Sequence, residues 1–205
     1  MIAILDYGVG NLFSLRSSFA AIGAEATVTA DPAVICAADK LVLPGVGAFE
    51  DAARKLRESG LDRLLKKEVA RGKPLMGICL GMQLLFERSY EYGEHEGLEL
   101  LEGSVLPFSA HIADSYKIPH IGWNRLSLCT DSPLWKYVKQ GDYVYFVHSF
   151  FVPVSEKYTA ATAEYGISFT AAVAKNNIYG CQFHPEKSGN VGLGILRGFC
   201  EAEGL

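Results

Sequence analysis

The sequence contains neither a CxxC pair nor a cluster of histidines and cysteines, so nothing in it indicates a zinc site or another metal centre. Its cysteines are odd in number and scattered, at Cys36, Cys79, Cys129, Cys181 and Cys200. Unpaired thiols of this kind are typical of a reducing compartment. We therefore expect a cytoplasmic protein that holds no metal ion.

Long apolar runs and an excess of positive charge are also missing. No run approaches the roughly 20 apolar residues that span a bilayer. The first residues, MIAILDYGVGN, include an acidic side chain and no basic leader, unlike a signal peptide. The formal net charge of -4 argues against a nucleic-acid-binding surface. We expect neither a membrane nor a nucleic acid as a partner.

The first half of the chain alternates short apolar runs with amphipathic stretches, several of which end at glycine. This alternation predicts a parallel sheet that is covered by helices on both faces. Strands are expected at residues 2–5, 26–30, 40–44 and 74–78, and helices at residues 11–22, 48–60, 61–72 and 81–91.

The second half is richer in β-type segments, which are separated by turns. Strands are expected at residues 99–108, 120–128, 142–153, 158–166, 169–175 and 177–183, and helices only at 132–138 and 191–203. A mixed or antiparallel layer must therefore join the parallel one. The predicted fold is one α/β domain, residues 1–205, with a central, mostly parallel sheet, helices on both faces and a β-rich second half.

Cys79 lies where the strand at 74–78 meets the next helix, in the pattern Gly77-Ile78-Cys79-Leu80-Gly81. This G-x-C-x-G pattern is the thiol counterpart of the G-x-S-x-G nucleophile elbow. A helix N-terminus favours the thiolate, and the amide of Leu80 can point at a developing oxyanion. The competing interpretation of the pattern alone is a small buried cysteine at a strand end. The hypothesis of a nucleophile therefore needs a base.

His184 is the best candidate base among the five histidines. It follows an expected strand in the segment GCQFHPEKSG, and Pro185 holds it extended. Glu186, two residues on, then points to the same side and can orient the imidazole. Taken alone, His-Pro-Glu is more often a surface ion pair. Together with Cys79 it makes a Cys–His–Glu triad plausible.

A second oxyanion donor could come from the glycine-rich segment LPGVGAF, residues 43–49. Gly45, Val46 and Gly47 expose backbone amides beside the end of the strand that carries Cys79, if the two strands are neighbours. The alternative is a plain strand–helix turn. A phosphate loop is disfavoured because the segment lacks the G-x-x-x-x-G-K-[ST] pattern.

Three segments of the chain resemble those of the class I glutamine amidotransferases, the triad-type family. PLMGICLGMQLLFE resembles the nucleophile segment of that family, LVLPGVGAF its oxyanion strand, and GCQFHPEKS its His–Glu segment. DYGVGNL, PHIGWN and YFVHSF resemble the glutaminase subunits of imidazole glycerol phosphate synthase, from histidine biosynthesis. The resemblance covers essentially the whole chain and implies the α/β fold of that family.

The resemblance implies roles for particular residues. Cys79 would be the nucleophile, His184 the base and Glu186 its orienter. The implied oxyanion hole is formed at Val46, Gly47 and Leu80, and the implied substrate contacts are Gln83, Glu91 and the backbone at Ser149 and Phe150. The family usually has an aromatic hydroxyl where Phe150 stands, which is harmless if that contact is made by the backbone.

The implied reaction is hydrolysis of L-glutamine to glutamate and ammonia, without a metal or organic cofactor. The implied partner is a (β/α)₈ cyclase subunit, which would receive the ammonia in a heterodimer. The expected interface residues are Tyr7, Asn11, His120, Trp123 and Lys187.

Three alternatives remain open from the sequence. One is a glutaminase for another synthase, such as those that make GMP, anthranilate or pyridoxal phosphate. Another is a stand-alone cysteine hydrolase, although those typically place the histidine close behind the nucleophile. The third is a non-catalytic module, which an intact triad disfavours.

Overall fold

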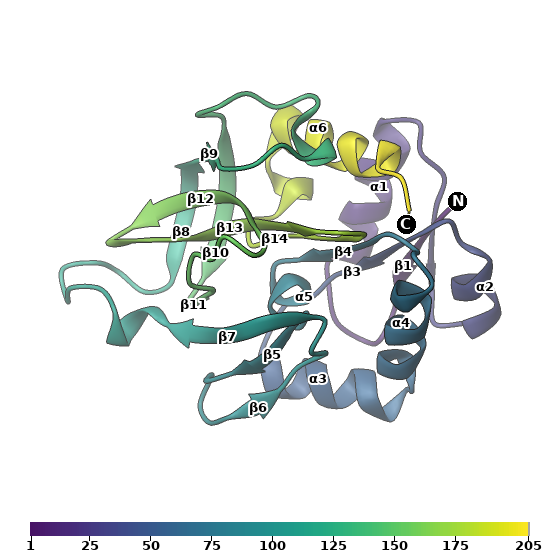
Figure 1. Cartoon of the computed structure of the whole chain (residues 1–205), viewed down its shortest axis with the longest axis horizontal. Helices are drawn as coiled ribbons and strands as arrows, with labels where there is room; N and C mark the ends of the chain where they lie inside the picture. The colour runs from purple at the N-terminus through teal and green to yellow at the C-terminus, as the bar shows by residue number, and fades with distance from the viewer. Residues whose placement is uncertain (205) are drawn as a thin grey trace.

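Three β-sheets organise the chain in the computed structural model, which describes residues 1–204 (Figure 1). The largest sheet has the strand order β2-β1-β3-β4-β14-β13-β12-β9, of which the first five strands are parallel and the rest antiparallel. The bounds are β2 (Ala26–Thr29), β1 (Ile2–Leu5), β3 (Lys40–Leu43), β4 (Leu75–Ile78), β14 (Ile178–Cys181), β13 (Ile167–Lys175), β12 (Thr159–Tyr165) and β9 (Ser127–Leu128). The predicted α/β class with a mostly parallel central sheet is confirmed.

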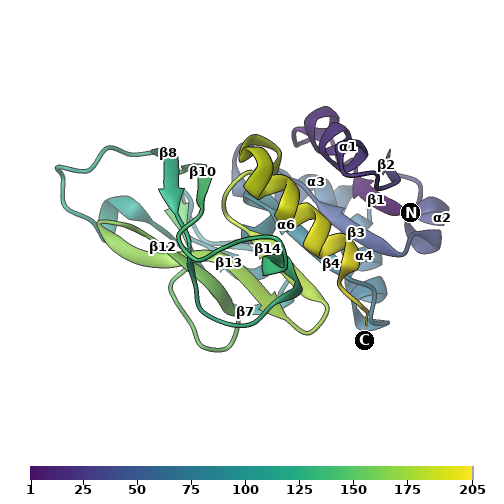
Figure 2. The ribbon, with the colours of Figure 1, turned by 90° about the horizontal axis from the view of Figure 1, so that it is seen from above.

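Helices cover both faces of this sheet because its strands are apolar on both sides. In β1, Ile2 and Ile4 join one buried cluster, whereas the alternate residues Ala3 and Leu5 join another. The first cluster packs under α1 (Leu12–Ala21) and α6 (Gly189–Glu201), which share one face of the sheet in Figures 1 and 2. The second packs against α2 (Pro32–Ala37), α3 (Phe49–Glu58) and α4 (Leu61–Ala70). No helix within residues 1–204 is long and apolar enough to cross a membrane.

Two smaller sheets stand beside the antiparallel half. One is the ribbon of β8 (His120–Arg125) and β10 (Tyr143–His148), and the other has the order β11-β7-β5-β6. The bounds of the latter strands are β11 (Phe150–Phe151), β7 (Leu101–Pro107), β5 (Phe86–Ser89) and β6 (His95–Glu96). Only Ser149 separates β10 from β11, so the chain passes from one sheet to the other at that residue.

The predicted helix at residues 81–91 is wrong beyond its first turn. Helix α5 (Leu80–Gln83) ends there, and β5 follows, paired with β7 on one side and β6 on the other. The Leu98 amide donates to the Leu84 carbonyl at 2.8 Å, which holds the segment after β6 against the end of α5. Sheet pairing thus overrides the helical pattern of the sequence in this segment.

Other predicted elements differ from the structure in detail. The strands expected at 120–128 and 142–153 are each split between two sheets. The helix expected at 132–138 is only a 3₁₀ turn, Pro133–Trp135. Helix α2 was not predicted, although Asp31 and Pro32 form a recognisable start: the Asp31 side chain accepts a hydrogen bond from the Ala33 amide at 2.8 Å.

Candidate active site

Cys79 lies on a sharp turn between β4 and α5. Its backbone has φ of 55° and ψ of -112°, a strained combination for a residue with a side chain. The Cys79 amide donates to the Cys181 carbonyl at 2.7 Å, which ties the turn to β14. The turn has the geometry that the G-x-C-x-G pattern predicts, and it places the cysteine at the carboxyl end of a central parallel strand.

The glycines around Cys79 are required because no Cβ fits at their positions. A Cβ on Gly81 would lie 1.9 Å from the Leu43 carbonyl oxygen, and one on Gly77 would lie 2.7 Å from the Gly81 oxygen. A Cβ on Gly45 would lie 2.7 Å from the Gly81 amide nitrogen. The elbow and the loop after β3 therefore pack backbone to backbone, which brings that loop beside Cys79.

His184 and Glu186 form a buried pair next to Cys79. His184 Nδ1 lies 2.8 Å from Glu186 Oε1, and the two side chains are 3% and 1% exposed. Burial lowers the pKa of His184, but the neighbouring Cys79 and Glu186 outweigh it and raise the pKa to about 10. The imidazolium is thus the favoured form of His184.

An open cavity of about 300 Å³ lies over Cys79 and His184. Its lining includes every residue expected at the oxyanion hole or in contact with substrate: Val46, Gly47, Leu80, Gln83, Glu91, Ser149 and Phe150. Tyr92, Pro119, Val147 and His148 complete it. Pockets that bind drug-sized ligands have volumes of about 300–1,000 Å³. This cavity is at the lower end of that range, so its size suits one small metabolite.

Val46 and Gly47 face this cavity, whereas Gly45 before them packs against the elbow. Val46 is 42% exposed, and Gly47 has φ of 93° with open space where a Cβ would stand. The positive φ requires glycine at position 47. Open space at position 47 leaves room for the Val46–Gly47 peptide to reorient.

Gln83 faces the cavity with its donors already occupied. Its Nε2 atom donates to the Phe150 carbonyl at 3.2 Å and to Gln182 Oε1 at 2.9 Å. The Phe150 carbonyl also accepts from His148 Nδ1 at 2.8 Å, so both of its lone pairs are used. Gln83 can then offer a ligand only its Oε1 acceptor, and the Phe150 carbonyl can offer nothing more.

Glu91 is held at the rim of the cavity by a helix end. Its Oε2 atom accepts a hydrogen bond from the Phe49 amide at 2.7 Å, in the first turn of α3. Burial raises the pKa of Glu91, while the Phe49 amide and the charge of His95 oppose that rise. A carboxylate here is suited to a cationic group on a bound ligand.

Two of the expected interface residues are buried, which corrects that part of the prediction. Tyr7 is 6% exposed, and its hydroxyl donates to the Pro44 carbonyl. His120 is 3% exposed and stacks on the ring of Tyr165 at 4.1 Å between centroids. Their side chains support the 44–47 loop and β8 from within the chain.

The other expected interface residues are more accessible. Trp123 on β8 is 55% exposed, and Lys187 is exposed with its ammonium 5.9 Å from the centre of the Tyr145 ring. The Tyr145 ring lies 6.1 Å from that of Trp123, so the three side chains form one surface patch. Asn11 is half-buried at the start of α1, where its side chain makes no capping hydrogen bond.

The sequence analysis missed Gln182 and Tyr92. Gln182 is fully buried, and its Nε2 atom lies 3.8 Å from Cys79 Sγ. Its position two residues before His184 could have revealed it, because alternate residues of an extended segment face the same side. Tyr92 is 92% exposed and packs edge-on against Phe150 at the cavity rim; no pattern in the sequence pointed to it.

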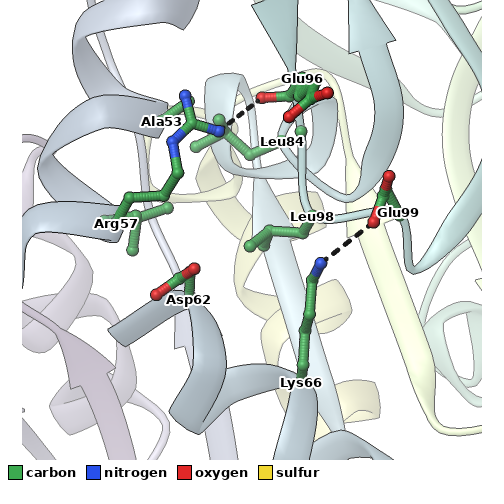
Figure 3. Close-up of a pocket in the computed structure, with 10 residues that line it drawn as sticks. Ala53, Arg57, Asp62, Lys66, Leu84, Glu96, Leu98 and Glu99 are labelled. Carbon is green, nitrogen blue, oxygen red and sulfur yellow. Dashed lines mark hydrogen bonds and ion pairs between the residues drawn. The ribbon is translucent and has the colours of Figure 1, made fainter. Parts of the chain in front are cut away.

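A second, smaller cavity of about 100 Å³ lies between α3, α4 and the 96–99 segment (Figure 3). Arg57 donates to the Glu96 carbonyl at 3.1 Å, and Lys66 pairs with Glu99 at 3.3 Å. Its lining contains no cysteine, serine or histidine that could act as a nucleophile or a base. Its polar lining consists of Arg57, Asp62, Lys66, Glu96 and Glu99, without the thiol and imidazole that meet at the Cys79 cavity.

Comparison with known proteins establishes the family. The family model described as glutamine amidotransferase class-I matches residues 3–200. The chain belongs to the class I glutamine amidotransferase family. Curated relatives of this amidotransferase include "Imidazole glycerol phosphate synthase subunit HisH" of Caldanaerobacter subterraneus subsp. tengcongensis, 48% identical over 202 residues that cover 98% of each chain. The subunit of the same name from Geobacter sulfurreducens is 48% identical over 204 residues, again 98% of each.

Solved structures share the fold of this amidotransferase. A structure titled "Crystal structure of glutamine amidotransferase" has a TM-score of 0.76 at 19% identity and covers 98% of this chain and 97% of that one. The "Structure of PurLQS from Thermotoga maritima" has a TM-score of 0.74 at 19% identity and covers 97% and 96%. At such identities the likeness concerns the fold alone.

Proposed function

We propose that this chain hydrolyses L-glutamine to glutamate and ammonia and passes the ammonia to a (β/α)₈ cyclase subunit that makes imidazole glycerol phosphate in histidine biosynthesis. The observation that carries the proposal is the convergence of Cys79, on its strained turn, with the buried His184–Glu186 pair at one cavity. The two relatives at 48% identity are named as subunits of that synthase, which favours it over the GMP, anthranilate and pyridoxal phosphate alternatives.

The first chemical step is attack by the Cys79 thiolate on the carboxamide carbon of glutamine. The carbon–nitrogen bond then breaks, and His184 gives its proton to the departing ammonia. Glu186 keeps the imidazole oriented and stabilises its charged form. The products of this step are free ammonia and a thioester on Cys79.

The second step is hydrolysis of the thioester by water, with His184 now acting as the base. Each step passes through a tetrahedral oxyanion. The Leu80 amide and the backbone at Val46 and Gly47 are the proposed donors to it, since all three residues line the cavity beside Cys79. Thiol, imidazole and backbone amides supply this chemistry, so the proposal includes no cofactor.

The contacts that we propose for glutamine follow from the free polar atoms of the cavity. Glu91 takes the α-ammonium group, because a carboxylate at the rim complements it. Gln83 contributes only its Oε1 acceptor, since its two N–H donors are occupied. The backbone at Ser149 completes the contact, together with the backbone of Phe150 apart from its carbonyl.

The cyclase would bind at the surface patch formed by Trp123, Tyr145 and Lys187. An exposed tryptophan packed against a partly buried tyrosine matches the aromatic residue types that anchor protein interfaces. Transfer across such an interface would keep ammonia from becoming ammonium, which is not nucleophilic.

The decisive experiment measures glutamate formation by the chain together with candidate cyclase subunits. Wild-type chain with the cyclase of the synthase should form glutamate, and the Cys79→Ala variant in the same complex should form none. Failure of the wild-type chain to hydrolyse glutamine with any candidate, or turnover of peptides by the chain alone, would contradict the proposal.

A further inference from the structure

Gln182 is a fully buried carboxamide that touches the proposed nucleophile. Its side chain is 0% exposed, and its Nε2 atom lies 3.8 Å from Cys79 Sγ. Burying a carboxamide is unfavourable unless its groups find partners. On the basis of the proposed function, we propose that Gln182 is a positioning residue, which holds an N–H donor against the sulfur and favours the thiolate.

The orientation of Gln182 is fixed by a relay that starts from a backbone carbonyl. The Phe150 oxygen can only accept, so the Gln83 atom that faces it at 3.2 Å must be the donor Nε2. The second N–H of Gln83 then meets Gln182 at 2.9 Å, and the atom of Gln182 that it meets must be the acceptor Oε1. The remaining group of Gln182, its Nε2 donor, is therefore the one that faces Cys79.

The backbone holds Gln182 and His184 against the same sulfur. The Gln182 amide donates to the Ala171 carbonyl at 2.8 Å, and the His184 amide donates to the Tyr145 carbonyl at 2.9 Å. Gln182 Nε2 lies 3.8 Å from Cys79 Sγ, and the His184 side chain hydrogen-bonds to Cys79. Cys79 thus faces an imidazolium and a neutral N–H donor, and hydrogen bonds to an ionised group are about twice as strong as neutral ones.

Few other titratable groups face Cys79 within residues 1–204. Burial, and next the charge of Cys79, raises the pKa of Tyr7. Burial also raises the pKa of Cys181, followed by the charges of Glu186 and Cys79. Tyr7 and Cys181 therefore stay neutral near pH 7, and the His184–Glu186 pair is the charged neighbour of the sulfur.

The test removes the donor and follows the reactivity of Cys79 with iodoacetamide, an uncharged alkylating agent that does not need the glutamine contacts. Peptide-resolved mass spectrometry gives the alkylation rate of each cysteine between pH 5 and 9. We expect Gln182→Met to move the pH midpoint of Cys79 alkylation upward and to slow the reaction about ten-fold below that midpoint, the size of one modest hydrogen bond to a charged group. In the complex with the cyclase, kcat should fall by a similar factor while the KM for glutamine changes by less than about three-fold.

Asn177 provides a matched control at the opposite end of β14. It is also a buried carboxamide, and its Nδ2 atom donates to the Val69 and Lys73 carbonyls at 2.9 Å each. Asn177→Leu should lower stability and leave the pH profile of Cys79 unchanged. If Gln182→Met does not fold, Gln182→Asn replaces it in the test. The asparagine side chain is one methylene shorter, so its N–H donor lies farther from the sulfur.

The possible outcomes separate the two proposals. An unchanged alkylation midpoint in a folded Gln182 variant would overturn the role of Gln182, even if glutamine is hydrolysed normally. A midpoint that moves equally in Asn177→Leu would show a general loosening of the core and would also overturn it. If wild-type Cys79 alkylates no faster than the exposed Cys36 and Cys129, the proposed function itself fails.

Discussion

Glu186 Oε1 lies 2.8 Å from His184 Nδ1, and the other oxygen of this carboxylate is buried with no hydrogen-bond partner in residues 1–204. The charge of Glu186 is therefore directed almost wholly at one imidazole. A buried carboxylate with a single charged partner stabilises the protonated ring and fixes its tautomer, with Nε2 left for chemistry.

This arrangement predicts unequal effects of removing the three triad members. Cys79→Ala should abolish glutamine hydrolysis, and His184→Ala should come close to that, because one residue serves both proton transfers. Glu186→Gln should lower the rate roughly ten- to a thousand-fold, since it orients and stabilises without reacting. The measurement is the initial rate of glutamate formation in the complex with the cyclase.

The control for these variants is synthesis from added ammonium salts. All three complexes should still make product from ammonium at the wild-type rate, because the cyclase is untouched. Loss of that activity would mean that the substitutions damage folding or assembly. A Glu186→Gln variant as inactive as Cys79→Ala would show that Glu186 reacts directly.

Selective labelling should identify Cys79 as the reactive thiol. A diazo-ketone analogue of glutamine should modify Cys79 alone, because only this cysteine lies in the cavity beside an imidazolium. Cys36 and Cys129 are exposed and provide internal controls for accessibility without activation. Peptide mapping that found either of them labelled as fast as Cys79 would contradict the assignment.

The 45–47 loop should make glutaminase activity depend on the partner. A rotated Val46 peptide would aim a carbonyl at the oxyanion, and loss of one donor lowers turnover by roughly 10²–10³. We expect the chain alone to be at least about a hundred-fold slower than the complex with ligand-loaded cyclase. Initial rates for the chain, the chain with cyclase, and the chain with cyclase and its ligand test this.

Gly47 is the residue to change in the same assay. Its φ of 93° is strained for any other residue. Gly47→Val should therefore lower the ratio of the rate with cyclase to the rate without it, or remove activity. Gly23, also at positive φ and with open space around it, offers a matched Gly23→Val control outside the cavity lining. Equal rates with and without the cyclase for the wild-type chain would end the gating hypothesis.

Folding stability should be greatest near pH 6.5 and fall on both sides. Burial lowers the pKa of His120 to about 4 and that of His148 to about 3. Below their unfolded value of about 6.5, the unfolded chain binds protons that the folded chain does not, so stability falls as pH drops toward 4. The raised pKa of His184 has the opposite effect on stability. Its stabilising contribution to the folded state is fully present below the unfolded pKa of about 6.5 and is lost as the pH rises toward 10.

Urea unfolding at pH 5, 7 and 9 measures these slopes. Between pH 7 and 5 we expect a loss of about 2–4 kcal/mol from the two buried histidines. His148→Gln, which cannot titrate, should be less stable at pH 7 but show a clearly smaller loss between pH 7 and 5. A wild-type chain more stable at pH 5 than at pH 7 would contradict the neutral state of these rings.

The parts of the fold that follow local patterns were predictable from the sequence. Apolar runs located the parallel strands, and the G-x-C-x-G pattern located the turn at Cys79, because both depend on neighbours in sequence. The segment after Gln83 was not predictable in this way. Its helical pattern yields to pairing with β7, and that pairing depends on residues more than ten positions away.

The same limit applies to the candidate site. The pairing of His184 with Glu186 was predicted from an extended segment, but the structure forms it differently, because Pro185–Lys187 is a 3₁₀ turn that brings the two side chains together. The burial of Tyr7 and His120 was beyond sequence reasoning, because it arises from contacts with Pro44 and Tyr165. Tyr7 and His120, which were expected at the surface, instead pack inside the chain.

The positive φ of Cys79 also has an evolutionary consequence. Only glycine adopts φ of 55° and ψ of -112° without strain, so Cys79→Gly should be more stable than Cys79→Ala by about 1 kcal/mol, measurable by urea unfolding. Selection for stability alone therefore pushes position 79 toward glycine. In a laboratory evolution experiment that screens only for heat resistance, this position should drift away from cysteine early. A lineage that retains Cys79 is thus under continuing selection for its thiol.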